Sequence, residues 1–181
     1  MKNLLYIYNG YYNYVILILT FILISIALYQ DLKYCKIKNK LNFTFILLGF
    51  IYNILINNGL NSLIGFIFPI WLLIFFKLRM MGAGDIKLLF ALGAVTGFPN
   101  IVYITIISII LNGLIALIIM IFRKNFLLRF KKIYYWLKTC VFFKEFVEYN
   151  GIDGERDGLF RYAIGIFMGS IIYYIYIIFF I

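Results

Sequence analysis

Long apolar segments separated by short basic connections make up most of this 181-residue chain. Two runs, 6–30 and 88–122, contain no charged residue and exceed the roughly 20 residues that a helix needs to cross a bilayer. Inside lipid, a helix satisfies its own backbone hydrogen bonds, which a loop cannot do. The pattern therefore predicts an all-α, polytopic integral membrane protein.

The same pattern predicts about six transmembrane helices. Their expected ranges are 11–30, 43–57, 60–76, 86–98, 101–122 and 162–181. The first range is taken as a helix in preference to a cleaved signal peptide because the apolar run is long. The second range covers only about 22 Å at 1.5 Å per residue, so a partial or thinned crossing is expected there. Since there is no flexible linker and no repeat, we expect a single transmembrane domain over residues 1–181.

The charges of the connections predict the orientation in the membrane. Connections 31–42, 77–87 and 123–161 are rich in Lys and Arg, whereas 57–62 and 97–100 contain neither. By the positive-inside rule the basic connections face the cytoplasm, which places both termini on the outer side of the cell membrane. The net charge of +10 is then explained by orientation and anionic lipid, and we expect no nucleic-acid partner.

The chain contains no histidine, and this excludes several classes of enzyme. Zinc sites of the HExxH type and Ser-His or Cys-His catalytic pairs all need one. No phosphate-binding GxxxxGK[ST] loop is present either. The two cysteines, Cys35 and Cys140, are expected to be free thiols. Carboxylates near lipid are therefore the strongest candidates for chemistry.

Asp31 and Asp85 are the only acids in the first 144 residues. Taken singly, Asp31 could be a loop acid paired with a nearby Lys, and Asp85 could simply cap a helix. The predicted topology, however, places both on the same face of the membrane. Two carboxyls within a few Å cannot both ionise cheaply, so one stays protonated, as an aspartyl dyad requires. Gly82 and Gly84 leave the backbone before Asp85 free to turn tightly or to lie beside a substrate strand.

Three segments carry a resemblance to a known family. Residues 81–94, MGAGDIKLLFALGA, resemble the signature of the type IV prepilin peptidases, GxGD aspartyl proteases that include archaeal preflagellin peptidases. Asp31 followed by 37–39, Ile-Lys-Asn, is similar to the family's first aspartate and its Ile-Pro-Asn-like tripeptide, with Lys38 in place of Pro. Residues 160–165 are similar to a late Pro-Phe-Gly-Pro-like turn that has lost its prolines.

The resemblance implies a membrane-embedded aspartyl endopeptidase without a cofactor. Asp31 and Asp85 would be the catalytic pair near the cytoplasmic surface, with Gly82, Gly84 and Lys87 as supporting residues of the motif. One carboxylate would take a proton from water, and the other, protonated, would hydrogen-bond the scissile carbonyl. The substrates would be pilin, pseudopilin or archaellin precursors that lose a short basic leader. Bifunctional members carry an added N-terminal methyltransferase region, whereas this chain begins at its first span, so we expect peptidase activity alone.

The longest connection, 123–161, is basic and aromatic in its first part and acidic near its end. We expect the first part to lie on anionic lipid at the membrane interface, in preference to forming a docking surface for a partner. The acids Asp153, Glu155 and Asp157 form either a solvated turn or a docking site for the basic leader. They also imitate the start of a calcium loop, but Ile164 stands at the last ligand position, so no metal is expected.

Two functions from other classes remain open. A proton- or ion-coupled carrier could use the aspartates together with Asn53 and Asn112, although the acids lie at helix ends and no repeat is visible. A non-catalytic assembly subunit of a secretion system would tolerate Asn at both acidic positions.

Overall fold

The computed structural model describes residues 14–77, 81–122 and 161–180, together with 131, 134–136, 138–139 and 142. The main described segments form α2 (Tyr14–Tyr34), α3 (Asn39–Leu55), α4 (Gly59–Ile67), the 3-10 helix η1 (Phe68–Leu72), α5 (Leu73–Lys77), α6 (Ala83–Thr96), α7 (Asn100–Phe122) and α9 (Tyr162–Phe180). No strand occurs among the described residues. The prediction of an all-α membrane protein is confirmed.

Four helical segments are long and apolar enough to cross a membrane: Tyr14–Tyr34, Gly59–Lys77, Asn100–Ile119 and Tyr162–Phe179. The expected ranges 43–57 and 86–98 correspond to α3 and α6, which have 17 and 14 residues and are shorter than a full crossing needs. The described part of the chain is therefore multi-pass. Six crossings remain a prediction.

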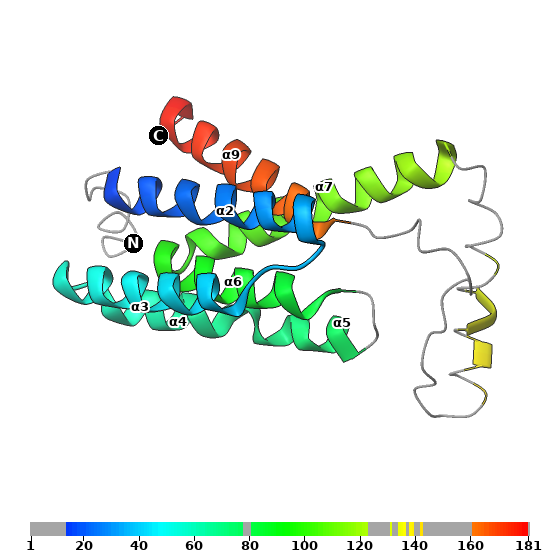
Figure 1. Ribbon diagram of the computed structural model, residues 1–181, viewed down its shortest axis with the longest axis horizontal. Coiled ribbons are helices and arrows are strands. Elements are labelled where there is room, and N and C mark those ends of the chain that lie inside the picture. Colours follow the sequence, from blue (N-terminus) through cyan, green and yellow to red (C-terminus); the bar gives the residue numbers. More distant parts are fainter. Residues whose placement is uncertain are drawn as a thin grey trace.

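The segment Gly59–Lys77 changes its helical form at Pro69. Proline has no backbone N–H and its ring crowds the preceding turn, so a regular α-helix is interrupted there. The chain continues through this point as η1, with the proline in the first turn, and then as α5. One apolar run thus becomes three short elements without leaving its direction (Figure 1).

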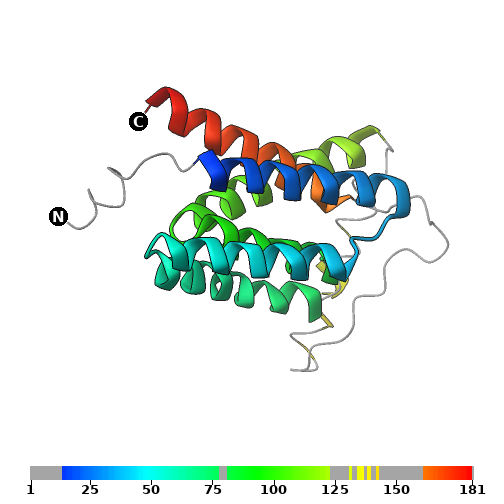
Figure 2. The same ribbon diagram turned by 60° about the vertical axis from the view of Figure 1, so that its left-hand side comes forward.

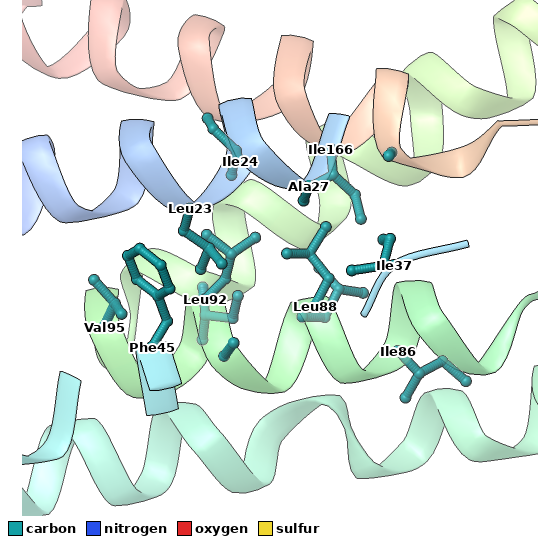
Figure 3. Packing of buried hydrophobic residues seen from close by; sticks show 14 of the residues in the cluster. Leu23, Ile24, Ala27, Ile37, Phe45, Ile86, Leu88, Leu92, Val95 and Ile166 are labelled. Atoms are coloured by element: carbon teal, nitrogen blue, oxygen red, sulfur yellow. The ribbon is translucent and has the colours of Figure 1, made fainter. Parts of the chain in front are cut away.

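Helix α6 lies at the centre of the bundle. Figures 1 and 2 show α2 and α9 on one side of it and α3 and α4 on the other. Nine of its residues, from Ile86 to Thr96, are buried. The surrounding helices supply the other buried apolar side chains, including Leu23 and Ala27 from α2, Phe45 from α3 and Ile166 from α9 (Figure 3). A short helix enclosed in this way needs little direct contact with lipid.

Glycines allow the backbones of α3 and α4 to approach one end of α6 very closely. We call residues 92–96 the distal end of α6. A Cβ on Gly49 of α3 would lie 2.8 Å from the carbonyl carbon of Ala94, and a Cβ on Gly93 would collide with the backbone carbonyl of Gly65 in α4. Helices in membranes associate largely through such close packing of small residues, because lipid supplies no hydrophobic driving force between them.

Buried polar side chains fasten the same distal end. Asn53 Nδ2 donates to the backbone oxygens of Gly49, Ala94 and Val95 at 2.9, 3.1 and 3.1 Å. Ser62 Oγ also donates to the oxygen of Ala94. Both side chains are fully buried. These bonds satisfy carbonyls near the end of α6 that have few partners within the helix.

Candidate active site

Asp31 lies in the last turn of α2 with only 8% of its surface exposed. Two groups from the start of α9 act on its carboxylate: the guanidinium of Arg161 and the backbone N–H of Ala163, which donates to it. Its Oδ2 atom is buried and has no hydrogen-bond partner in the described part of the chain. Burial is the largest influence on this carboxyl and disfavours its charged form, and Arg161 and the Ala163 N–H only partly oppose that effect. The unpaired Oδ2 can accept a further hydrogen bond.

Asp85 lies in the first turn of α6, three residues after the N-cap Gly82. The backbone N–H of Gly82 donates to its carboxylate, as in the reciprocal half of a capping box. Burial, followed by the nearby charge of Asp31, raises the pKa of Asp85 from 3.8 to about 7, and the Gly82 hydrogen bond only partly opposes this. Asp85 therefore keeps its proton at a pH where an ordinary aspartate has lost it.

The structure brings Asp31 and Asp85 together at one end of the bundle. They come from α2 and α6, and the charge of one acts directly on the other. Residues 82–87, which include Asp85, are called the dyad end of α6. Because the two carboxyls have different neighbours, they differ in their readiness to ionise. That difference is what an acid and a base acting on one bond need.

The two glycines of the motif have different surroundings. A Cβ on Gly82 would lie 2.8 Å from Oδ2 of Asp85, so any side chain there would displace the carboxylate. A Cβ on Gly84 would lie 3.6 Å from Cβ of Ile37, an ordinary contact. The lack of a side chain at Gly82 thus leaves room for the carboxylate of Asp85, whereas the lack of one at Gly84 leaves room for Ile37 in the connection between α2 and α3.

Lys87, the third supporting residue expected from the sequence, lies on the exposed side of α6. Its Nζ donates to Oδ1 of Asn39, the first residue of α3, at 2.9 Å. Its side chain therefore binds another helix, whereas the pKa of Asp85 is set by burial, by Asp31 and by the Gly82 N–H.

The start of α9 forms a third side of the site, and residue-by-residue reasoning on the sequence missed it. The side chain of Tyr162 hydrogen-bonds the Asn112 side chain and feels the charge of Asp85. Asn112 Nδ2 also donates to the backbone oxygen of Tyr162 at 3.2 Å. Only the resemblance of 160–165 to a late turn of the family pointed to this segment.

Asn53 and Asn112, the amides on which a carrier would depend, both bind backbone. Asn53 lies in α3 and donates to the distal end of α6, and Asn112 packs against Gly165, where a side chain would collide with it. Asn112 is linked to Asp85 indirectly: it hydrogen-bonds the Tyr162 side chain, which interacts with the charge of Asp85.

Several expected features fall outside the described residues or concern metals. Asp153, Glu155, Asp157 and Cys140 lie outside the described residues, as does most of 123–161. Cys35 is a free, exposed thiol. Among the described positions, no three His, Cys, Asp or Glu side chains gather as metal ligands would.

Comparison with known protein families identifies the family to which this chain belongs. The sequence model of the type IV leader peptidase family matches residues 17–117, more than half of the chain, and this range contains both Asp31 and Asp85. Searches of curated proteins and of solved structures gave no significant match. With its several apolar helices and this family match, the chain belongs to the type IV leader peptidase family and is a multi-pass membrane peptidase of the aspartic type.

Proposed function

We propose that this protein removes the short basic leader of prepilin-like precursors at the cytoplasmic face of the cell membrane, with Asp31 and Asp85 as its catalytic pair. The observation that carries the proposal is the meeting of two desolvated carboxyls from different helices, with a cation beside Asp31. No cofactor is required, because water, one base and one acid suffice to hydrolyse a peptide bond.

The surroundings assign the two roles. In this proposal Asp31, whose burial is partly offset by Arg161 and the Ala163 N–H, enters the reaction ionised and takes a proton from the attacking water. Asp85 holds the shared proton and gives it to the oxygen of the scissile carbonyl. The new C–O bond makes a neutral tetrahedral diol. As it collapses, Asp31 passes its proton to the leaving nitrogen, the C–N bond breaks, and a hydroxyl proton returns to Asp85.

The location of the pair supports cleavage at the membrane surface. The start of α2 and the end of α9 lie at one end of the bundle, and the end of α2 and the start of α6 lie at the other (Figures 1 and 2). These last two segments carry Asp31 and Asp85. The connection after Asp31 carries Lys33, Lys36 and Lys38, all exposed, as expected for the cytoplasmic side. We therefore propose six crossings of one domain over 1–181, with both termini outside.

A precursor fits this placement because its apolar helix can lie in the bilayer beside the enzyme. Its leader junction then reaches the level of the two carboxyls. The acids Asp153, Glu155 and Asp157 are proposed to attract the basic leader. Supporting roles for Gly82, Gly84 and Lys87, and cleavage without N-methylation, remain predictions.

The test replaces each aspartate singly by asparagine, which keeps the size and removes the acid. The variants are co-expressed with a precursor that has a basic leader before an apolar helix, and processing is followed by the mobility of the product. We expect each of D31N and D85N to lower the cleavage rate by at least about 10²–10⁴-fold while the protein still inserts.

Two other outcomes would reject the proposal. Cleavage that continues in D31N or D85N would show that the acids have another role. If instead a pH gradient across proteoliposomes collapses through the wild type but not through the variants, and cleavage is unaffected, the protein is a carrier.

A further inference from the structure

The connection between α2 and α3, residues 35–38, is fastened to the turn of α2 that carries Asp31. Cys35 ends the helix with φ of 50°, and its N–H donates to the backbone oxygen of Asp31 at 3.0 Å. The chain then reverses, and the N–H of Lys38 donates to Oε1 of Gln30 at 2.9 Å. Since Gln30 immediately precedes Asp31, the connection cannot move without disturbing this turn.

The same connection also packs against the dyad end of α6. Ile37 is only 4% exposed and enters the buried cluster together with Leu88 (Figure 3). It lies over Gly84, at a distance where a Cβ on that glycine would just touch it. Ile37 therefore fills the space between the end of α2 and the residue preceding Asp85.

One hydrogen bond joins the start of α3 directly to the dyad end of α6. Asn39, which follows the connection, accepts from Nζ of Lys87 at 2.9 Å, and Lys87 stands two residues after Asp85. Both side chains are exposed, so this bond adds little to stability. Its two ends are nevertheless 48 residues apart in the chain, and they stand eight residues after Asp31 and two residues after Asp85. Gln30, the connection and Lys87 form a continuous path from Asp31 to Asp85.

We propose that the Asn39–Lys87 hydrogen bond is a positioning contact that sets the separation of the two aspartates. This inference rests on the proposed function, because it concerns how the pair shares one proton. The interaction between two charges falls with their distance, and misplacing catalytic groups by about 1 Å can cost 10²-fold in rate. Asn39 and Lys87 touch no reacting atom, and they act through the connection.

The experiment compares variants that break the bond with variants that keep it. N39A and K87M remove one partner each, whereas N39D and K87R keep an acceptor and a donor. K40M is the matched control, because Lys40 is an exposed lysine of the same stretch that takes no part in the path. Each protein is purified in lipid nanodiscs, and kcat and KM are measured on a synthetic precursor peptide, with thermal unfolding measured alongside.

We expect N39A and K87M each to lower kcat by about 10-fold to 100-fold with KM within about twofold of the wild type. The double variant should be no slower than the slower single variant, because both changes break one contact. N39D, K87R and K40M should stay within about threefold of the wild type.

The pH dependence of kcat distinguishes a positioning role of Asn39 from a merely structural one. N39A is used because Asn39 carries no charge, so only the spacing changes. The groups that act on Asp85 are Asp31 from α2 and the Gly82 N–H at its own helix end, and the Tyr162 side chain from α9 interacts with its charge. A larger separation weakens the effect of Asp31, so the alkaline fall in kcat should move to lower pH in N39A.

Three results would overturn the inference: wild-type kcat in N39A and K87M, losses that multiply in the double variant, or an unmoved pH profile in an N39A that has lost activity. If one variant does not fold, the other decides. Failure of this inference leaves D31N and D85N inactive, whereas failure of the proposed function leaves those two variants able to cleave.

Discussion

The two ends of α6 differ in how they meet their neighbours. At the distal end, Gly93 and Gly65 bring two backbones into contact, and Asn53 donates to three carbonyl oxygens. At the dyad end, Gly82 leaves room for a carboxylate, and Oδ2 of Asp31 is buried without a partner in the described chain. The same residue type, glycine, serves backbone packing at one end and a charged group at the other.

One end of α6 therefore contributes mainly to the stability of the fold, and the other end contributes mainly to the proposed catalysis. Paired polar groups and tight backbone contact stabilise the distal end. At the dyad end, the desolvated carboxyl of Asp85 and the unpaired Oδ2 of Asp31 from α2 cost free energy and are useful only if something binds there. Substitutions at the two ends should therefore change different measurements, and the following predictions are ordered from the largest effect to the smallest.

Gly82→Ala should damage catalysis without damaging the fold. The backbone of Gly82, with φ of −71° and ψ of 145°, suits alanine, but the new Cβ would lie 2.8 Å from Oδ2 of Asp85 and displace the carboxylate. We expect kcat to fall by about 10²-fold, a typical loss for a misplaced catalytic group. Thermal unfolding in nanodiscs should stay within about 2 °C of the wild type. A fall in stability that matches the fall in activity would contradict this assignment.

Gly93→Ala should do the opposite. Its Cβ meets the backbone carbonyl of Gly65, which cannot rotate away as a side chain could. We expect a destabilisation of about 1–3 kcal/mol, with kcat of the folded fraction unchanged. Gly113→Ala in α7 is the matched control, because nothing lies within 4 Å of its Cβ. It should be neutral or stabilising by up to about 1 kcal/mol, and equal stability of the two variants would disprove the role of Gly93.

Asp85→Asn should show the cost of the buried acid as a function of pH. The pKa of Asp85 is about 7 in the folded protein and 3.8 as the reference value. Between these values the folded protein binds more protons than the unfolded chain, so wild-type stability falls as pH rises through this window. The asparagine variant lacks this titration. Its stability relative to the wild type should therefore rise from pH 4 to pH 7 and level off above, as measured by unfolding at constant ionic strength.

The same titration predicts the alkaline side of the activity profile. Because the proposed mechanism needs Asp85 protonated, kcat should fall about tenfold per pH unit above pH 7. A rate that is constant up to pH 9 would show that Asp85 does not hold the proton.

Gly84→Ala should have the smallest effect, although it alters the family motif. The added Cβ only touches Ile37 at 3.6 Å, so we expect kcat within about threefold of the wild type. Gly84→Val adds two methyl groups and should push Ile37 outward, with a loss of activity similar to that of N39A. If alanine alone abolishes cleavage, Gly84 contacts the substrate and its role is not to fit Ile37.

The sequence alone determined the class of the molecule. Uninterrupted apolar runs predicted an all-α membrane protein because backbone hydrogen bonds must be satisfied inside lipid. The lack of histidine and the scarcity of acids reduced the candidates for chemistry to Asp31 and Asp85. Local patterns report such features well, because hydropathy and residue type need no knowledge of what lies beside them in space.

Only the tertiary structure decided what lies beside those residues. Arg161 and Ala163, at the start of α9, flank Asp31; Lys87 binds Asn39; and Gly93 meets Gly65. All of these contacts join segments far apart in the chain. The structure also places the short α6 at the buried centre of the bundle. Such pairings depend on helix register and packing, and one sequence does not carry that information in any local window.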